Sequence, residues 1–570
     1  MIVGIDLGTT NSLLAVWQNG EPRLIPNSLG EFLTPSCVSV DEDGSILIGK
    51  AARERLQTHP TQSAAVFKRH MGSNMQFNLG GRNFRAEELS ALILRALKED
   101  AEAALGQPIA EAIITVPAYF SDAQRKATRA AGQLAGLKVE RLLNEPTAAA
   151  LAYGIHQRDK ETQFLVFDLG GGTFDVSVLD LFEGVMEVRA SAGDNFLGGE
   201  DFVNLLIDEF FKQASIPLEL KNDGRFMQSL VAQVEQAKRQ LSEAAEATLQ
   251  THHAGISYSM PLNEAALERI SAPLLARLRS PVERALRDAN LHTANLDNIV
   301  LAGGATRMPI VRRMVARMFG RFPSCDINPD EVVALGAAVQ AGLKMNDAAL
   351  DEIVMTDVAP YSLGVEVSMH LGRDQFSYGH FDPIIERNTV VPVSKVKSYY
   401  PNSEKQNALR INVFQGEARM VRDNISLGSI EIPISQVAGQ DNGVDVRFTY
   451  DANGLLQVEA TVTLTKKTHS LVIEGNPGVL TPEEITQRFA ALSELKIHPR
   501  ERIEFRTMLA RGERLYQQLR GEAREELGRQ LMQFERALEA QDDRTSRQAS
   551  RTFQEVLEYF EHQSFLNLDE

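Results

Sequence analysis

Two segments of the chain repeat one arrangement of residues that could hold a phosphate group. Residues 2–16 and 165–179 each run from an apolar strand through Asp-Leu-Gly and small residues into a second apolar strand, with Asp6 and Asp168 at equivalent places. Such a unit predicts a β-hairpin whose tight turn exposes several backbone N–H groups, and these can cradle a phosphate because small residues allow close approach. One copy is usually only a turn. Two copies 162 residues apart (168 minus 6) predict related half-domains that face each other across a cleft. Hydroxyl donors in the turns would be Thr9, Thr10 and Thr173.

A third element has the composition expected of a nucleotide site. The apolar run 299–301 is followed by Gly303 and Gly304. Because glycine has no side chain, such a pair lets a flat base or a ribose lie against the backbone. Alone, this segment is more simply interpreted as a strand-to-helix turn. Together with the two hairpins, it indicates nucleotide binding.

Size and composition limit the classes of protein to consider. A chain of 570 residues is too long for one hydrophobic core, so we expect about two to four domains. The formal net charge of -17 and the lack of a long basic stretch argue against nucleic acid as a partner. No apolar run is long enough to span a bilayer, and the strand-like run at 2–5 leaves no room for a signal peptide. With only Cys37 and Cys325 no disulfide framework is expected, and we predict a cytoplasmic protein without a membrane partner.

Hydrophobic patterning divides the chain into four parts. Residues 1–346 alternate short Val, Ile and Leu runs with amphipathic segments, which predicts an α/β domain. Residues 347–357 contain a short apolar stretch flanked by acids, which is typical of a linker. Residues 358–475 show near period-two alternation split by Gly, Asn and Asp turns, which predicts strands. Residues 476–570 open with a helix-start signal at 481–484 and are expected to be helical.

Several individual elements stand out within these parts. Strands are expected at 113–116, 164–167, 299–301, 409–414, 444–450 and 455–464. Helices are expected at 86–105 and 227–241, with a hairpin turn at 451–454. An apolar stripe at helical spacing, typical of bundle packing, consists of Leu527, Leu531, Phe534 and Leu538.

Six short segments form a set that occurs together in one protein family. They are GIDLGTTNS, VPAYFSDAQR, RLLNEPTAAALAYG, FDLGGGTFDVS, LGGEDF and LAGGATRMP. The first, fourth and sixth resemble the phosphate-one, phosphate-two and adenosine motifs of the actin, hexokinase and heat-shock ATPase superfamily. The whole set resembles the DnaK-type chaperones of the heat shock protein 70 family. The resemblance continues to the final helices, and its departures in short segments are similar to the specialised bacterial HscC branch.

This resemblance implies a multidomain fold. An actin-like ATPase α/β domain with duplicated ribonuclease H-like halves would be followed by a β-sandwich peptide-binding domain and a C-terminal α-helical lid. Residues 114–128 and 328–342 resemble the family's connecting helices, in which small residues let two helices pack closely. The implied protein is a monomeric, ATP-dependent molecular chaperone whose ATP hydrolysis controls the binding and release of client polypeptides.

The resemblance also implies a cofactor and a catalytic set. ATP or ADP is expected with Mg²⁺, and K⁺ is a further candidate ion. Asp6, Glu145 and Asp168 match an acidic cluster around Mg²⁺, which carboxylates can hold largely through water. Lys68 matches the catalytic lysine, whose ammonium would stabilise charge that develops during transfer. Thr173 matches the threonine that contacts the γ-phosphate and water, and Glu145 and Asp168 belong to the same catalytic set.

Two groups of residues would hold the nucleotide. The phosphate loops would contribute Gly8, Thr9, Thr10, Asn11, Gly170, Gly171, Gly172, Thr173 and Asp175. The adenosine pocket would contribute Glu235, Lys238, Arg239, Ser242, Gly303, Gly304, Arg307 and Asp330. The first four of these are spaced i, i+3, i+4 and i+7, which puts them on one helical face, as a shared ligand requires.

Coupling between the domains is expected from the same resemblance. An element with two states, each making different contacts, typically provides a coupling of about 1–3 kcal/mol. The apolar linker would be that element, through Ile353, Val354 and Met355. Pro117 and Arg125 match the family's relay and interdomain contact positions. The positions at which a J-domain co-chaperone docks in the family are matched by Arg141, Asn144 and Asp357.

The β-rich part would hold an extended client segment by main-chain hydrogen bonds and a central apolar pocket. The pocket positions are Val365, Val367, Tyr399, Leu409 and Ile411, with Ser368 and Asn402 arching over the peptide. Leu409 stands where a smaller valine is usual, which should make the pocket shallower. The stretch 368–386 is longer than in the housekeeping form, so client preference does not transfer.

Other functions remain open at this point. A small-molecule kinase of the same superfamily would share the two hairpins but would not explain the parts after residue 346. A binding module in which nucleotide switches a docking surface for one protein partner is compatible with the altered arch. The segments 53–87 and 242–263 are short, and these are the outer lobes where a nucleotide exchange factor normally grips, so its involvement is left open.

Overall fold

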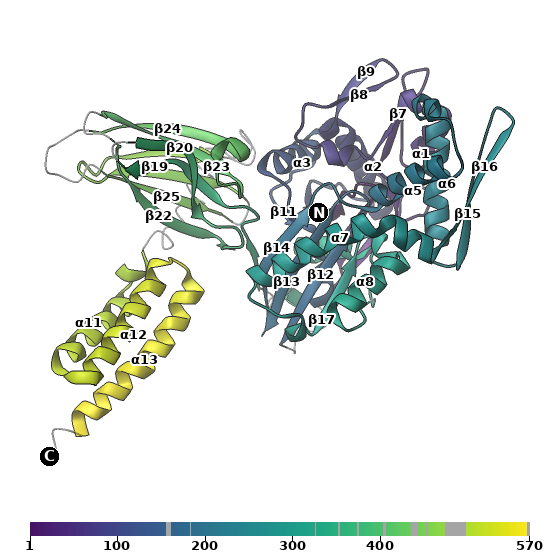
Figure 1. Ribbon diagram of the computed structural model, residues 1–570. Coiled ribbons are helices and arrows are strands. Elements are labelled where there is room, and N and C mark those ends of the chain that lie inside the picture. Colours follow the sequence, from purple (N-terminus) through teal and green to yellow (C-terminus); the bar gives the residue numbers. More distant parts are fainter. Residues whose placement is uncertain are drawn as a thin grey trace. The chain divides into compact units, whose positions relative to one another are not determined.

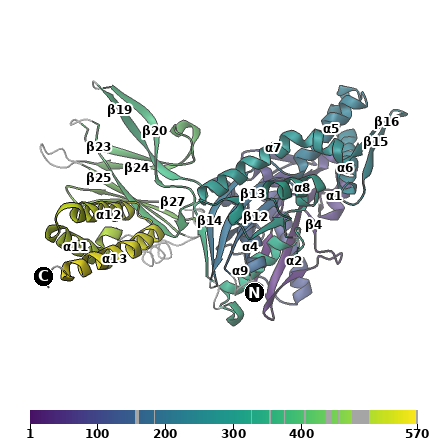
Figure 2. The ribbon, with the colours of Figure 1, turned by 60° about the horizontal axis from the view of Figure 1, so that its bottom comes forward.

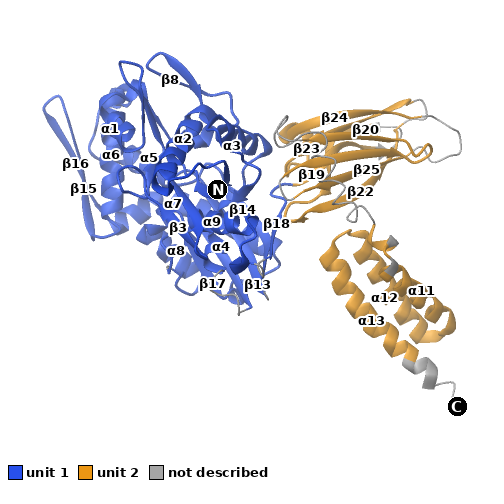
Figure 3. Cartoon of the chain, turned by 180° about the vertical axis from the view of Figure 1, so that it is seen from behind, with its two compact units in different colours: residues 1–361 blue, residues 362–570 orange. Residues whose placement is uncertain are grey.

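The computed structural model describes residues 1–154, 161–182, 184–324, 326–350, 354–372, 375–402, 406–434, 443–451, 454–473 and 498–566. Its chain divides into two compact units, Met1–Tyr361 and Ser362–Glu570 (Figure 3). The helix start predicted at 481–484, the middle of the turn at 451–454, Cys325 and Ile353 lie outside the described residues. None of the described helices combines the length and the apolar character needed to cross a membrane.

The first half of unit 1 is built on a mixed sheet with the strand order β11-β10-β1-β2-β3. The strands are β1 (Ile2–Asp6), β2 (Asn11–Gln18), β3 (Glu21–Ile25), β10 (Glu111–Val116) and β11 (Leu142–Asn144). Strand β1 pairs in parallel with β10 and antiparallel with β2. Helices cover the sheet, among them α2 (Ala86–Leu105) and α3 (Asp122–Leu134). Because both faces are covered, the strands are near-continuous apolar runs with Val3, Ile5 and Val116 fully buried.

The second half of unit 1 repeats this arrangement. Within unit 1 its strand order is β17-β12-β13-β14-β18. The strands are β17 (Asn298–Ala302), β12 (Thr162–Leu169), β13 (Phe174–Phe182), β14 (Val185–Asp194) and β18 (Val354–Val358). Strand β12 pairs in parallel with β17 and antiparallel with β13, just as β1 pairs with β10 and β2. Both predicted hairpins are therefore confirmed, and the sequence repeat is also a structural repeat.

Two helices made largely of small residues pack closely at the centre of unit 1. They are α4 (Glu145–Gly154) and α9 (Val332–Lys344), and α9 also lies on β1 and β2. A Cβ atom placed on Gly336 of α9 would lie 1.7 Å from the carbonyl oxygen of Ala148 in α4. The expected close helix pair is present, but its members differ from the expectation. Residues 114–116 belong to strand β10, and the extensive contact of α9 is with α4.

The remaining elements of unit 1 lie around these two sheets (Figure 1). The 3₁₀ turn η2 (Phe67–His70) belongs to the first half, and the helices of the second half include α5 (Gly199–Gln213), α6 (Gly224–Gln240), α7 (Glu264–Asp288) and α8 (Pro309–Phe319). The helix predicted at 227–241 corresponds to α6, which starts three residues earlier. Asp223 explains this start, because its side chain accepts hydrogen bonds from the N–H groups of Arg225 and Phe226 as an N-cap.

Unit 2 contains two four-stranded antiparallel sheets, with the orders β20-β19-β23-β24 and β22-β25-β26-β27. The first has β19 (Leu363–Gly372), β20 (Gln375–Ile385), β23 (Ala408–Gln415) and β24 (Ile425–Pro433). The second has β22 (Val393–Tyr399), β25 (Val444–Tyr450), β26 (Leu456–Val462) and β27 (Thr468–Ile473). The three strands predicted in this region correspond to β23, β25 and β26.

The C-terminal part of unit 2 is helical, as Figure 2 shows. Its described helices are α11 (Ile503–Gln518), α12 (Gly521–Glu539) and α13 (Asp543–Leu566). The four residues of the predicted apolar stripe lie on α12 and are all buried in one cluster with Phe505, Leu515 and Phe553. The interpretation of that stripe as bundle packing is confirmed.

Candidate functional site

A cavity of about 370 Å³ in unit 1 brings together residues from both halves. The first half lines it from the β1–β2 turn, from Lys68 and from Glu145; the second half lines it from the β12–β13 turn, from α6 and from the segment after β17. Of the predicted nucleotide and catalytic residues, all but Gly172 and Asp175 line this cavity. The lining also includes residues not predicted as site residues, among them Gly199, Glu200, Glu243, Met308 and Val333.

The two hairpin turns lie against each other at the base of the cavity. A Cβ atom on Gly171 would lie 2.0 Å from Oγ1 of Thr10, and one on Gly172 would lie 2.7 Å from Oγ1 of Thr9. Any larger residue would therefore push the turns apart. Gly8 is equally constrained, because its Cβ would lie 2.0 Å from the carbonyl oxygen of Asn11. Gly8, Gly171 and Gly172 are therefore required by these close approaches, whereas a Cβ on Gly170 would come no nearer than 3.7 Å to another group.

Lys68 is buried at the edge of the cavity and pairs with Glu145. Its Nζ lies 2.6 Å from Oε1 of Glu145, and only 3% of the Lys68 side chain is exposed. The Phe120 ring lies below the ammonium, 5.6 Å from Nζ to the centroid. Lys68 sits on η2, whose N-cap Val66 has a φ of 59°. A β-branched residue in the left-handed region is strained by about 1–3 kcal/mol, so the surrounding structure must hold this segment in place.

The carboxyl groups of the cavity are crowded and buried. Burial raises the pKa of Asp6 to about 7, helped by the neighbouring Glu145 carboxylate, while Lys68 and a hydrogen bond from Thr115 act in the opposite direction. The pKa of Asp168 lies well above its usual range, mainly because the carboxyl group is buried. The negative charges of Glu145 and Asp175 raise this pKa further. Within the described residues, Oδ2 of Asp168 has no hydrogen-bond partner. Such a set of acids favours the binding of an additional cation.

Asp175 lies behind the cavity wall. It is 1% exposed, and burial followed by the charge of Glu145 raises its pKa to about 8. Its Oδ1 accepts a hydrogen bond of 3.1 Å from the backbone N–H of Tyr119. Asp175 pairs directly with Asp168 in the β12–β13 ladder. Its carboxylate, however, is hydrogen-bonded to a backbone N–H of the first half.

The other end of the cavity is formed by α6 and the segment after β17. Glu235 lies 2.6 Å from Lys238 and 2.6 Å from Arg239. Burial opposes the ionisation of Glu235, but Lys238 and Arg239 together hold its pKa below the usual value. Lys238 also donates to the carbonyl oxygen of Gly199, with a distance of 3.1 Å. Three of the four residues predicted to share one face are therefore tied together at the cavity wall.

The glycine pair after β17 meets a second ion pair. A Cβ on Gly304 would lie 2.6 Å from Oδ1 of Asp330, and one on Gly303 would lie 2.3 Å from the carbonyl oxygen of Leu169. Nε of Arg307 donates to Oδ2 of Asp330 at 2.8 Å. Gly303 and Gly304 line the cavity without side chains, next to the Arg307 guanidinium that Asp330 holds in place. Such a surface suits a planar ring and a ribose.

The predicted coupling residues form a polar chain outside the cavity. Arg125 donates to Oδ1 of Asn144 at 2.7 Å, and Nδ2 of Asn144 donates to both carboxylate oxygens of Asp357 at 3.0 and 3.1 Å. Burial raises the pKa of Asp357, opposed by its hydrogen bonds and by the charges of Arg141 and Arg125. Val354 and Met355 lie on β18, which pairs in parallel with β14. The segment predicted as a linker thus adds a strand to unit 1.

The predicted peptide positions lie in unit 2. Val365, Leu409 and Ile411 are buried, and Oη of Tyr399 donates to Asp382 at 2.7 Å. Val367 is half-buried on β19. The two residues predicted to arch over a peptide are hydrogen-bonded to each other, because Nδ2 of Asn402 donates to Oγ of Ser368 at 2.5 Å.

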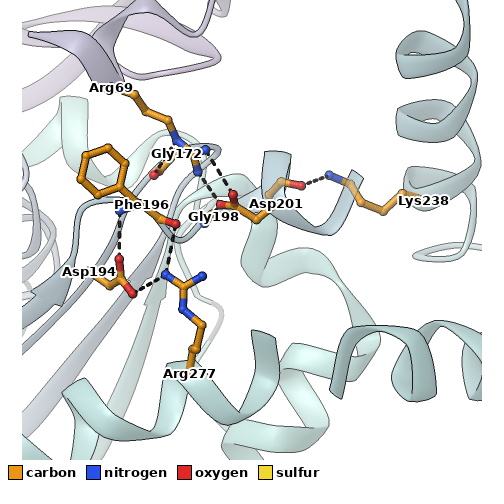
Figure 4. A network of polar contacts seen from close by, with 9 residues as sticks. Arg69, Gly172, Asp194, Phe196, Gly198, Asp201, Lys238 and Arg277 are labelled. Atoms are coloured by element: carbon orange, nitrogen blue, oxygen red, sulfur yellow. Dashed lines mark hydrogen bonds and ion pairs between the residues drawn. The ribbon is translucent and has the colours of Figure 1, made fainter. Parts of the chain in front are cut away.

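Sequence reasoning missed the contacts that Arg69 makes beside the cavity (Figure 4). Arg69 donates to the carbonyl oxygen of Gly172 and to both carboxylate oxygens of Asp201. Both partners are far from Arg69 in sequence, so no local pattern connects them. The only available signals were the position of Arg69 next to Lys68 and that of Asp201 within LGGEDF.

In the part of the chain that the structure describes, no group of three or more His, Cys, Asp or Glu side chains is arranged to hold a metal ion by itself. The residues nevertheless fit a hydrated cation, on two observations. Within the described residues an oxygen of Asp168 lacks a partner, and burial opposes ionisation of Asp6 and Asp168 when no cation is bound. Direct ligation is not required when water completes the shell.

Comparison with protein families agrees with this geometry. A family model described as Hsp70 protein matches residues 2–566. The matched range includes the repeated hairpins, the cavity residues and both sheets of unit 2. Since this is almost the whole length of the sequence, the chain belongs to the Hsp70 family.

Proposed function

We propose that the chain is an ATP-dependent molecular chaperone in which ATP binding and hydrolysis in unit 1 control the binding of extended client segments by unit 2. The observation that carries the proposal is the cavity, where two phosphate-type turns, a buried lysine and an acidic cluster meet. Family membership supports the chaperone class. The actin-like description of unit 1, the peptide-binding role of the two sheets and the lid role of the helices are parts of the same proposal.

Within this proposal, the turns at 8–11 and 170–173 would hold the phosphates, and the α6 face with Gly303, Gly304, Arg307 and Asp330 would hold the adenosine. Asp6, Glu145 and Asp168 would hold Mg²⁺ largely through water, and K⁺ is a further candidate. The bound cation would supply charge neutralisation at the phosphates.

The chain's own residues would then do the following work. Lys68 places an ammonium at the cavity, where its Nζ lies 2.6 Å from Oε1 of Glu145. Thr173, buried at the second turn, offers a hydroxyl toward the cavity that it lines. Burial of this set keeps bulk water away, so each charge acts with greater strength than it would in solvent. The arrangement suits the transfer of a phosphoryl group to water.

Nucleotide should stabilise unit 1 against unfolding. ADP with Mg²⁺ at about 100 times its Kd is expected to add about 2.7 kcal/mol to the free energy of unfolding, because a ligand that binds only the folded state shifts the equilibrium by mass action. Trp17, the single tryptophan, is 4% exposed on β2 and reports this unit by its fluorescence during urea unfolding.

The matched control for this measurement is Gly171→Val. Its side chain would collide with Thr10, since a Cβ there lies 2.0 Å from Oγ1, and the shift with ADP should disappear. A wild-type protein whose unfolding midpoint does not change with nucleotide would contradict the assignment of the cavity.

Peptide affinity should depend on the nucleotide. A coupling of about 1–3 kcal/mol corresponds to a change of about 5–150-fold, and we expect weaker peptide binding with ATP than with ADP. The measurement is binding of a labelled peptide library in both states. The variant Asn144→Ala should reduce the difference, because Asn144 joins Arg125 to Asp357 beside β18. Equal affinities in ATP and ADP would refute the coupling.

The same experiment separates the alternatives. The hydrogen-bonded Ser368–Asn402 arch favours, as a second candidate, a nucleotide-switched module that binds one dedicated protein partner. That module would bind a folded partner but none of the library peptides. A small-molecule kinase would consume ATP only in the presence of a sugar or a carboxylic acid.

We also propose the working context. A J-domain co-chaperone would dock at Arg141, Asn144 and Asp357 and raise the ATPase rate. The protein would act as a monomer in the cytoplasm, with client polypeptides and without nucleic acid or membrane partners. Placement in the HscC branch, a relay through Pro117, a linker role for Ile353, and the need for a nucleotide exchange factor belong to this proposal as well.

A further inference from the structure

We infer that Arg69 is a positioning residue. Its hydrogen bonds hold η2, the turn of the first half that carries Lys68, against the second phosphate turn at residues 170–173. The inference rests on the proposed ATPase function, and it assigns a role to a residue that neither lines the cavity nor belongs to the predicted site.

The guanidinium of Arg69 donates hydrogen bonds to three acceptor oxygens (Figure 4). Its Nε lies 3.0 Å from the carbonyl oxygen of Gly172, Nη1 lies 3.2 Å from Oδ1 of Asp201, and Nη2 is bonded to Oδ2 of the same carboxylate. The side chains of Arg69 and Asp201 are only 13% and 20% exposed. A two-pronged, partly buried pair of this kind holds its geometry better than an exposed ion pair.

The acceptors belong to one connected block. Asp201 is the third residue of α5, where its carboxylate also accepts from the N–H of Gly198 at 2.8 Å, a favourable place for an anion at the start of a helix. The N–H groups of Gly199 and Glu200 donate to the carbonyl oxygens of Gly170 and Gly171, each at 2.9 Å. Arg69 is thus attached to the start of α5 and to the 170–172 turn together.

The other end of the connection is the short turn that carries Lys68. In η2 the neighbours Lys68 and Arg69 reach different partners, Glu145 in the first half and Gly172 with Asp201 in the second. Because η2 spans only Phe67–His70, a restraint on Arg69 also restrains Lys68. The strained Val66 at its start makes such a restraint necessary. Arg69 therefore sets the position of the Lys68 ammonium relative to the second turn.

Lysine would not replace Arg69. One ammonium cannot reach a backbone carbonyl and both oxygens of a carboxylate with the planar fork that these three contacts require. Arg277 provides a comparison within the same picture (Figure 4). It pairs with Asp194 at 2.7 Å and donates to the carbonyl oxygen of Phe196 at 3.3 Å, and both of these contacts lie within the second half.

The test compares Arg69→Gln, Arg69→Lys and Asp201→Asn with the control Arg277→Gln in the full chain. For Arg69→Gln we expect about a tenfold fall in kcat and about a tenfold faster release of a fluorescent ADP analogue, the size of one charged hydrogen-bond contribution. Without nucleotide, amide exchange at Arg69 and Met71 should also rise, since their N–H groups close the η2 turn. Arg277→Gln should leave all three readouts within about twofold of the wild type.

Further comparisons distinguish a specific contact from general damage. Arg69→Gln combined with Asp201→Asn should be no worse than Arg69→Gln alone, because both remove the Arg69–Asp201 interaction, and Arg69→Lys should restore only part of the function. If Arg69→Gln does not fold, Asp201→Asn carries the same test. An active wild type with Arg69→Gln and Asp201→Asn indistinguishable from Arg277→Gln would overturn this inference alone. A wild type that neither binds nor hydrolyses ATP would overturn it together with the proposed function.

Discussion

Replacing Lys68 by alanine is expected to lower the maximal rate of ATP hydrolysis by about 100-fold or more while nucleotide affinity changes little. Removing one preorganised donor from a buried site typically costs about 10²–10³ in turnover. Lys68 qualifies as such a donor because it is 3% exposed and held by Glu145 at 2.6 Å. Steady-state hydrolysis and ADP titration on the same preparation measure the two quantities.

The control for Lys68→Ala is Lys50→Ala. Lys50 also pairs with a glutamate at 2.6 Å, but the side chains of Lys50 and Glu31 are 51% and 45% exposed, and exposed pairs contribute little. We expect wild-type hydrolysis from this variant. Unchanged hydrolysis in Lys68→Ala would refute the role assigned to Lys68. Equal losses of affinity and rate would instead assign Lys68 to nucleotide binding.

Replacing Gly336 by alanine is expected to reduce the free energy of unfolding by about 3 kcal/mol, at the upper end of the usual cost of overpacking. The added methyl group would lie 1.7 Å from the carbonyl oxygen and 2.4 Å from the carbonyl carbon of Ala148. These are backbone atoms of a fully buried helix, so they cannot turn away as a side chain could. Because α4 begins with Glu145, the displacement should also weaken nucleotide binding.

Urea unfolding followed by Trp17 fluorescence measures the effect on stability. Trp17 packs against α9, where a Cβ on Gly342 would lie 2.5 Å from its ring. Gly224→Ala is the matched control, because the nearest atom to its new methyl group would be Cγ of Pro60 at 3.8 Å. We expect this variant to stay within about 1 kcal/mol of the wild type. A similarly small loss in Gly336→Ala would show that α4 and α9 can separate without cost.

Much of the site could be predicted because its elements are local in sequence. A hairpin that binds phosphate needs an apolar strand, a glycine turn and a second strand within about 15 residues, and both copies were visible as one pattern. The α6 face was equally visible, because helical spacing places Glu235, Lys238 and Arg239 together. Individual roles such as that of Lys68 came only from the family resemblance, since a single lysine carries no local signal.

Two predicted residues are not in the cavity lining, for reasons that only packing reveals. The carbonyl group of Gly172 faces Arg69, and the carboxylate of Asp175 accepts from the N–H of Tyr119. Likewise, the family resemblance implied that residues 114–128 would supply the close partner of α9, whereas α4 does so. Small residues show that a helix can be approached closely, but they do not identify which helix approaches it.

Strands, turns and helix faces could be predicted from the residues alone, because backbone geometry and hydrophobic periodicity depend on neighbouring residues. The tertiary structure alone decided which distant groups meet, such as Lys68 with Glu145 over 77 positions and Arg69 with Asp201 over 132. It also decided the elevated pKa values of Asp6 and Asp175. Removal of water around a carboxyl group depends on everything packed near it, and the folding of both halves around one cavity sets that environment.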